Sequence, residues 1–254
     1  MNLPTPLEKT LLLVCAALLA LAAFGPPLEQ LPHFHDFADQ RPWWGMPNAG
    51  DVLSNLLFAL GGLLGLMGLR RWRAGLVSQA EQSLAALSFT GLLLTALCSG
   101  YYHWQPDDAG LVVDRLGMCV AFAGLLGLAA AGRISGRAGL VLAASLLLLA
   151  PMTVWVWAES GNLLPWAVLQ FGGMGLLLWL AARPALAGAL PVRWAWVVVI
   201  YALAKCLELG DAAVFEATGE WVSGHTLKHI VASLAAWPVL AALAGVLKSP
   251  WKSR

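Results

Sequence analysis

The stretch SGYYHWQPDDAGLVVDRLGM, residues 99–118, joins two strongly apolar segments through a short polar connection. The first apolar segment covers residues 83–103, and the second begins near Asp114 and reaches residue 131. Apolar runs of about 20 residues can cross the hydrocarbon core of a bilayer, about 30 Å thick, as helices. The stretch therefore predicts two antiparallel transmembrane helices, with Ser99, His103 and Asp114 gathered at the membrane surface where the chain turns.

The composition indicates the same class for the whole chain. Of its 254 residues, 59% are hydrophobic and only 11% are charged, with a formal net charge of +1. These values are typical of a polytopic membrane protein. The chain has no basic face and no nucleic-acid motif, which argues against a nucleic-acid partner. The four cysteines all lie in apolar segments without a CxxC pair, so they are expected to be packing residues and not a disulfide framework.

Eight apolar segments predict eight membrane-spanning helices in an all-α bundle, formed by residues 10–24, 52–69, 83–103, 114–131, 138–157, 163–181, 194–215 and 224–247. The alternative for residues 10–24 is a cleaved signal peptide, but no clear small-x-small cleavage site follows Phe24. Residues 25–51 form a polar, proline-containing loop. We expect one integral-membrane domain over residues 1–254, with an extra first helix, this loop and a seven-helix core over 52–247.

Basic residues predict the orientation. Eight spans place residues 1–9, 70–82, 132–137, 182–193 and 248–254 on one side of the membrane. Eleven of the fifteen basic residues lie in these segments: Lys9, Arg70, Arg71, Arg73, Arg133, Arg137, Arg183, Arg193, Lys248, Lys252 and Arg254. The positive-inside rule makes this side, and both termini, cytoplasmic. Compact loops and Ala/Leu-rich helices favour a bacterial inner membrane.

The same alternation of the spans across the membrane places three of the five histidines at the extracytoplasmic surface. His103 ends one apolar segment, and His225-x-x-x-His229 begins the last one. A spacing of four residues puts two side chains on one helix face. Three imidazoles and a water are the ligand set of a catalytic zinc site. The alternative is hydrogen-bonded interfacial histidines, but three at one depth on one side favour a metal site.

Two further side chains at this surface have both a structural and a chemical interpretation. Ser99 either bonds back to a helix carbonyl, as serines in membrane helices commonly do, or donates to an oxyanion. Asp114 is either an acid at a helix N-terminus or a base acting on a zinc-bound water; it could also orient a ligand histidine.

The loop suggests a second metal site. Asp36, Asp39, Asn48 and Asp51 make it rich in oxygen ligands, which calcium prefers. The alternative is a solvated acidic loop. A separate set, Lys205, Glu208 and Asp211, lies within the seventh apolar segment, and its role is left open between structural pairing, a network behind the metal ligands and a proton path.

Taken together, these motifs resemble the alkaline ceramidases, which belong to a wider superfamily of membrane hydrolases that includes the adiponectin-receptor-like proteins. The matching pattern is Ser-x-x-x-His, an aspartate eleven residues later, and a late His-x-x-x-His. The matching stretches are residues 99–118, GHTLKHIVASLAAW (224–237) and DVLSN (51–55), and the resemblance spans roughly residues 36–245. The chain departs from the family in its extra first helix and in a loop about two residues shorter.

The resemblance implies roles for these residues. Zinc would be held by the three histidines, with Asp114 as base on the zinc-bound water and Ser99 stabilising the oxyanion. It also implies calcium in the loop, where a neutral Asn48 replaces an acid and Asp51 compensates. The best-matching calcium ligands are Asp36, Asp39 and Asn48, with backbone carbonyls near Phe37 and Arg41.

The expected function is that of an integral-membrane zinc amidohydrolase. It would cleave the N-acyl amide of ceramide or a related membrane lipid to a free fatty acid and a sphingoid-type base. An intramembrane serine protease is disfavoured because no GxSxG motif is present. The alternative is a metal-dependent receptor, or an ion transporter that uses Glu208 and Asp211. The sequence does not indicate an oligomeric state.

Overall fold

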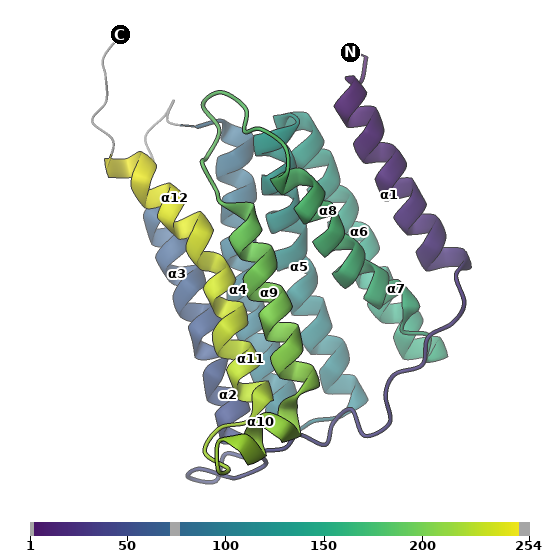
Figure 1. Cartoon of the computed structure of the whole chain (residues 1–254), viewed down its shortest axis with the longest axis vertical. Coiled ribbons are helices and arrows are strands. Elements are labelled where there is room, and N and C mark those ends of the chain that lie inside the picture. Colours follow the sequence, from purple (N-terminus) through teal and green to yellow (C-terminus); the bar gives the residue numbers. More distant parts are fainter. Residues whose placement is uncertain (1–2, 72–76, 249–254) are drawn as a thin grey trace.

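The computed structural model describes residues 3–71 and 77–248, and in this part of the chain it is a bundle of helices (Figure 1). The helices are α1 (Pro6–Phe24), α2 (Ala49–Ser54), α3 (Leu56–Arg70), α4 (Gln79–Trp104), α5 (Asp108–Arg133), α6 (Gly136–Ser160), α7 (Leu164–Ala167), a π-helical turn (Val168–Gly172), α8 (Gly173–Ala181), α9 (Trp194–Leu209), α10 (Asp211–Ala217), α11 (Gly224–Ser233), a 3₁₀ turn (Leu234–Ala236) and α12 (Trp237–Lys248).

Seven helical segments of the described residues are long and apolar enough to cross a membrane. They are α1, α2–α3, α4, α5, α6, α7–α8 and α11–α12. The remaining predicted span, the seventh along the chain, contains α9, whose 16 residues make a helix about 24 Å long. It lies alongside the others in the bundle (Figure 1). The predicted all-α transmembrane bundle is thus confirmed.

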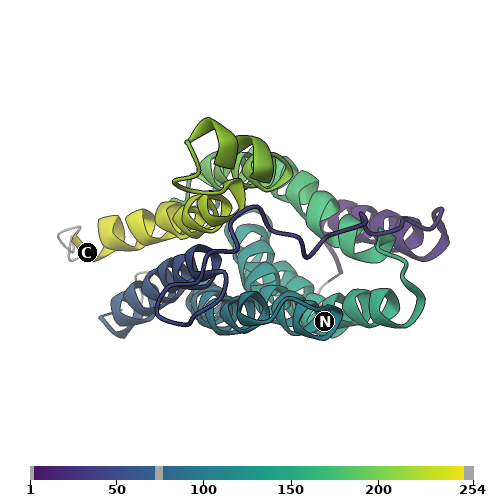
Figure 2. The same ribbon diagram turned by 90° about the horizontal axis from the view of Figure 1, so that it is seen from below.

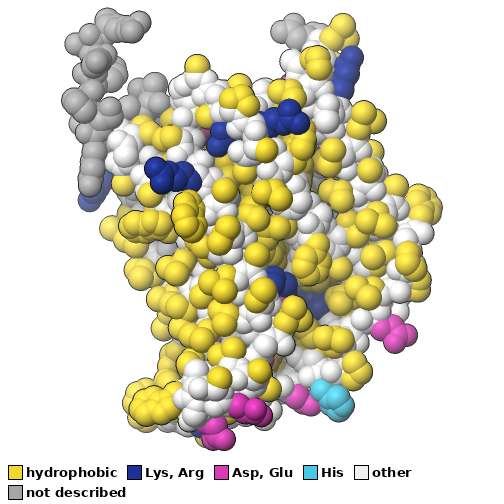
Figure 3. All heavy atoms as spheres, in the orientation of Figure 1, with side chains coloured by type: hydrophobic (Ala, Val, Ile, Leu, Met, Phe, Trp, Pro, Cys, Tyr) yellow, Lys and Arg dark blue, Asp and Glu magenta, His cyan; other side chains and the backbone are white. Residues whose placement is uncertain are grey.

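Successive long helices run in alternating directions (Figure 1). The first residues of α1 and the last residues of α12 therefore lie at one end of the molecule. The 25–48 loop, the α4–α5 turn, α10 and the start of α11 lie at the opposite end. Figure 3 shows basic side chains at the first end, and acidic and histidine side chains at the second. Of the basic residues used to predict orientation, Arg73, Lys252 and Arg254 lie outside the described residues.

The extra first helix lies at the edge of the bundle, next to α7 (Figure 2). Only 11% of its membrane-spanning window is buried. One polar anchor holds its start, because the buried Glu8 carboxylate accepts hydrogen bonds from Ser135 and Arg137, each at 2.7 Å. The helix is therefore held at its start by this anchor, and Leu11 joins the main hydrophobic core, while most of its surface stays exposed.

Close packing sets the positions of α4 and α5. A Cβ added to Gly91 of α4 would lie 2.3 Å from the backbone nitrogen of Ala121 in α5. A Cβ added to Gly124 of α5 would lie equally close to the backbone nitrogen of Ser88. Small residues let helix backbones approach closely in membranes, where van der Waals packing drives association. This contact fixes α4 and its His103 beside α5 and its Asp114.

Two predicted helix boundaries are wrong. Helix α5 begins at Asp108, six residues before the predicted start, because Asp107 caps it by accepting from the Gly110 N–H at 2.6 Å. The helix predicted over 194–215 is interrupted at Gly210, a residue with low helix propensity. The other predicted ends agree with the structure within four residues, and the loop predicted to reach residue 51 ends where α2 begins at Ala49.

Candidate metal centre

Three histidines converge at the end of the bundle that carries the 25–48 loop. His103 lies in the last turn of α4, and His225 and His229 lie on successive turns of α11. Their exposed fractions are 0%, 5% and 3%. Ser223 caps α11 by accepting from the Thr226 N–H at 2.9 Å, so the His-x-x-x-His pair begins in regular helix.

The spacing of the imidazole nitrogens suits a metal ion. One ring nitrogen from each histidine lies within 4.8 Å of the others, so the group can hold a metal. The Nε2 atoms of His103 and His225 are 3.4 Å apart. Two nitrogens bound at 2.0–2.1 Å to a tetrahedral ion would be separated by about 3.3–3.4 Å. Within residues 3–71 and 77–248, no other group of three or more His, Cys, Asp or Glu side chains converges in this way.

A hydrogen bond orients the His229 ring. The Ser54 hydroxyl donates to the Asp51 carbonyl at 3.0 Å, so its oxygen accepts from the Nδ1–H of His229 at 2.9 Å. This tautomer leaves the lone pair of Nε2 for a metal. Ser54 was not singled out from the sequence, although it belongs to the DVLSN stretch that carries part of the family resemblance.

The N-terminal loop closes over the same ligands. The Asp211 carboxylate accepts from the backbone N–H of His225 at 2.7 Å and from that of Ala38 at 3.0 Å, which ties the loop to α11. The ring of Phe37 packs on the rings of His103 and His225, with centroids 4.7 and 4.4 Å away. The role of Asp211, which the sequence left open, is therefore to fix backbone positions.

Ser99 and Asp114 lie beside the histidines. Both line a cavity of about 90 Å³ whose wall also contains His225 and His229. Ser99 and Asp114 lie on the same cavity wall, close enough to interact, whereas Ser88 and Thr95 on the same helix donate to carbonyls four residues earlier. Asp114 lies nearly two turns inside α5, so an interpretation as the N-terminal acid of that helix is wrong.

Further charged side chains line this cavity. The Glu208 carboxylate of α9 pairs with Lys228 of α11 at 2.7 Å and with Lys205 one turn away on α9. The pairing of Lys205 with Glu208 was among the options from the sequence. The sequence did not indicate Lys228 as the second partner, because that contact crosses between two helices.

An apolar cavity of about 110 Å³ adjoins the polar one inside the bundle. The two cavities share five wall residues: Phe58, Thr95, Met118, Tyr201 and Ala232. Most of the remaining wall of the deeper cavity is apolar. The histidine cavity therefore adjoins a second cavity whose wall is largely hydrophobic.

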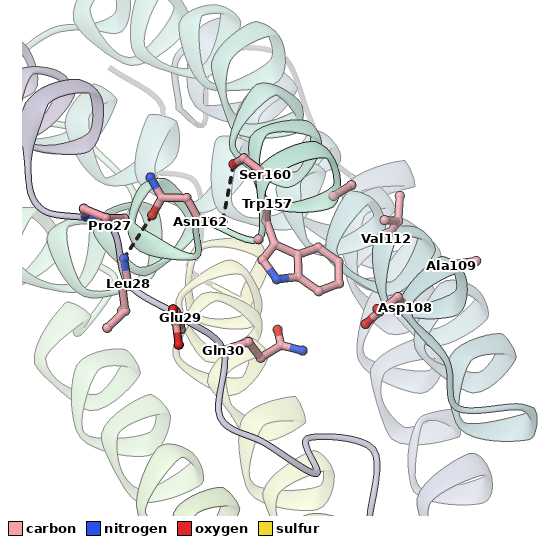
Figure 4. A pocket seen from close by; sticks show the side chains of 12 residues that line it. Pro27, Leu28, Glu29, Gln30, Asp108, Ala109, Val112, Trp157, Ser160 and Asn162 are labelled. Carbon is pink, nitrogen blue, oxygen red and sulfur yellow. Dashed lines mark hydrogen bonds between the residues drawn. The ribbon is translucent and has the colours of Figure 1, made fainter.

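An open pocket of about 690 Å³ lies on the other side of Arg115. Figure 4 shows loop residues 27–30 on one side of this pocket, and Trp157 and Asp108 on the other. The Arg115 guanidinium donates to Gln30 at 2.6 Å and stacks 4.1 Å from the centroid of the Trp157 ring. Because Arg115 also lines the histidine cavity, this side chain separates that cavity from the open pocket.

The four predicted calcium ligands do not converge on one point. Asp36 pairs with the exposed His33 at 3.0 Å. The Asn48 amide donates to the His103 carbonyl at 3.0 Å. Asp51 accepts from the Thr226 hydroxyl at 2.6 Å.

Asp39 already has a cationic partner. The Arg41 guanidinium donates to both oxygens of Asp39, each at 2.7 Å, and also to the Trp221 carbonyl at 3.2 Å. This guanidinium holds the pKa of the Asp39 carboxyl below its usual range. The residues present therefore do not fit a calcium ion, and calcium binding stays a prediction that the loop geometry does not support.

No protein-family model matches the chain, and no curated protein matches it either. The resemblance to alkaline ceramidases accordingly stays a prediction from the motifs. Any assignment of function depends on the geometry and chemistry of the residues around the three histidines.

Proposed function

We propose that this chain is an integral-membrane, zinc-dependent amidohydrolase that cleaves the N-acyl amide of ceramide or a related lipid. The products would be a free fatty acid and a sphingoid-type base. The observation that carries this proposal is the convergence of three buried histidines beside the Ser99–Asp114 pair, at the end of an apolar cavity.

The donor set favours zinc. Catalytic zinc sites commonly combine three protein ligands with one position for water or substrate. Here three histidine nitrogens face one another within 4.8 Å, and the Ser54 bond fixes the ring of His229 as outer partners of zinc ligands do. When bound, zinc supplies a Lewis acid that polarises a carbonyl oxygen and makes water a stronger nucleophile.

The protein's own groups complete the reaction. Asp114 accepts the proton of the attacking water and then delivers it to the amide nitrogen, so that the C–N bond breaks and the amine leaves. Ser99 donates its hydroxyl hydrogen to the oxygen that gains negative charge. Both groups lie on the wall of the cavity that His225 and His229 also line.

The cavities support a lipid substrate. The apolar cavity next to the histidine site can accept the first few carbons of the acyl chain, and the amide would then lie next to the metal ligands. Burying an apolar chain in such a cavity is favourable by about 0.8 kcal/mol per methylene.

The distribution of basic residues supports an orientation with both termini in the cytoplasm and the site near the extracytoplasmic face. The compact loops and Ala/Leu-rich helices favour a bacterial inner membrane. The acidic and histidine side chains gather at that end of the molecule (Figure 3).

The test measures zinc content and fatty-acid release for the purified parent, His225→Ala and Asp114→Asn. We expect one zinc per parent chain and release of fatty acid from a long-chain ceramide or another N-acyl lipid. His225→Ala should lose both zinc and release, whereas Asp114→Asn should keep zinc and lose release. Zinc without release from any N-acyl lipid would instead favour a metal-dependent receptor or an ion transporter. Release by Asp114→Asn at the parent rate would contradict the proposed role of Asp114.

A further inference from the structure

The wall of the histidine cavity carries more positive than negative side chains. Three basic residues line it, Arg115, Lys205 and Lys228, against two acids, Asp114 and Glu208. Charged groups inside a membrane protein are costly unless they are paired. The cavity wall therefore carries one more positive than negative charge, and a bound metal would add to this excess. The excess charge requires an anionic partner.

Lys205, Lys228 and Arg115 carry more hydrogen-bond donors than the acceptors that pair with them. Glu208 is the only acid that pairs with Lys205 or Lys228 among the described residues, and each of its oxygens serves one ammonium. An ammonium has three N–H donors. The Nη1 of Arg115, a residue only 3% exposed, has no hydrogen-bond partner in the described part of the chain. The cavity can thus offer several charged donors to a ligand.

The lysines can also be approached from outside. Their side chains are 25% and 19% exposed, although they lie within membrane-spanning helices. Figure 3 shows basic side chains in the middle of an otherwise apolar face of the molecule. A lipid that carries an anionic group would pair with the lysines, whereas a neutral head group would leave the surplus charge unpaired.

We propose that Lys205 and Lys228 form a carboxylate subsite, and that the substrate is an N-acyl amino acid whose free carboxylate binds there. This inference rests on the proposed amidohydrolase function. In such a lipid the carboxylate is two bonds from the amide nitrogen. With the first carbons of the acyl chain in the apolar cavity and the amide beside the histidines, the carboxylate falls in the polar cavity that the lysines line.

Product chemistry points the same way. Hydrolysis of ceramide frees an amine that becomes cationic at neutral pH, and two lysines and an arginine would repel it. Hydrolysis of an N-acyl amino acid frees an amine that carries its own carboxylate. That carboxylate stays paired with the lysines after the C–N bond breaks.

The experiment compares affinities for two matched lipids that cannot be hydrolysed. They are analogues of N-palmitoylglycine and N-palmitoylethanolamine in which a methylene replaces the amide nitrogen, so that they differ only in a carboxylate against a hydroxymethyl group. We expect the zinc-loaded parent to bind the carboxylate analogue at least about tenfold more tightly, as a charge-assisted hydrogen bond implies. Lys205→Met and Lys228→Met should each bring this ratio close to one, and Lys228→Arg should retain most of it.

A lysine on the exposed face of α1 supplies the control, because Lys9→Met should leave the ratio unchanged. Should Lys228→Met fail to fold, Lys228→Gln and Lys205→Met provide the same comparison.

Equal affinities in the parent, or an unchanged ratio in both lysine variants, would overturn the subsite. If the lysines had a purely structural role, their replacement would lower both affinities together and leave the ratio unchanged. Hydrolysis of N-palmitoylglycine and ceramide is measured separately, so a carboxylate preference without hydrolysis would contradict the proposed enzyme and leave the subsite in place.

Discussion

The carboxylate of Asp211 accepts a hydrogen bond from the backbone N–H of His225 at 2.7 Å, and its other oxygen holds Ala38 of the N-terminal loop. One acid thus positions both a metal-ligand helix and the loop that covers it.

Removing this acceptor should weaken metal binding. We expect Asp211→Ala to lower zinc affinity by about 10- to 100-fold, the range seen when partners behind metal ligands are lost. Competition with a fluorescent zinc chelator measures this affinity. Glu216→Ala, which removes an exposed acid from the same short helix, serves as the control. Equal zinc affinities in Asp211→Ala and Glu216→Ala would contradict the role of Asp211.

The Ser54–His229 bond should act on the metal in a different way. Ser54→Ala removes the acceptor that selects the Nδ1–H tautomer of His229, so zinc affinity should again fall by about 10- to 100-fold. Ser88→Ala is a matched serine whose hydroxyl donates to a helix carbonyl away from the site, and it should leave the affinity unchanged. The same competition titration decides the matter, since a parent-like value for Ser54→Ala would rule out this orientation of the ring.

The Asp39–Arg41 pair predicts a pH dependence. Arg41 lowers the folded-state pKa of Asp39, so this pair adds stability above the unfolded pKa of about 4 and loses it as the pH falls through the lowered pKa. The parent should therefore be more stable than Arg41→Met near neutral pH, and the gap should close in acid. Melting temperatures recorded from neutral to acid pH provide the measurement. A gap that stays constant, or that widens in acid, would be inconsistent with the pairing.

Calcium and zinc removal should differ in effect. Because the Arg41 guanidinium already lies 2.7 Å from both Asp39 oxygens, a calcium-selective chelator should leave the melting temperature unchanged. A zinc-selective chelator should lower it, since a ligand that binds only the folded state stabilises that state. A rise in melting temperature on adding calcium alone would show that the loop binds calcium after all.

Helix contact between α4 and α5 should tolerate no added methyl group at Gly91. Its Cβ would lie 2.3 Å from the Ala121 backbone nitrogen, so Gly91→Ala should destabilise the fold by about 1–3 kcal/mol. Gly100 lies on the same helix with open space around its Cβ position, so Gly100→Ala should cause no such loss. Unfolding in mixed micelles measures both free energies. Equal stability of the two variants would contradict the close approach.

The bundle and the histidine group were predictable because their signals are local. Apolar length predicts a span, and a four-residue spacing predicts a shared helix face. The sequence also predicted which end of the molecule the ligands share, since alternating spans place His103 and His225 on one side. Whether that end is extracytoplasmic stays a prediction.

What the sequence could not predict depends on contacts between segments. The α5 boundary was wrong because Asp107 and Asp108 look like loop residues until the Asp107 cap is known. Lys228 pairs with Glu208 across two different helices, a contact that no local spacing reveals. The loop acids looked like calcium ligands because a residue pattern does not reveal that Arg41 folds back onto Asp39.

The ring of Phe37, only 5% exposed, lies on the outer side of His103 and His225. An ion that leaves or reaches the histidines from the aqueous side must wait until this ring and the segment behind it move. Metal exchange should therefore be slow even where the equilibrium favours the chelator, so the protein would keep its ion through brief scarcity.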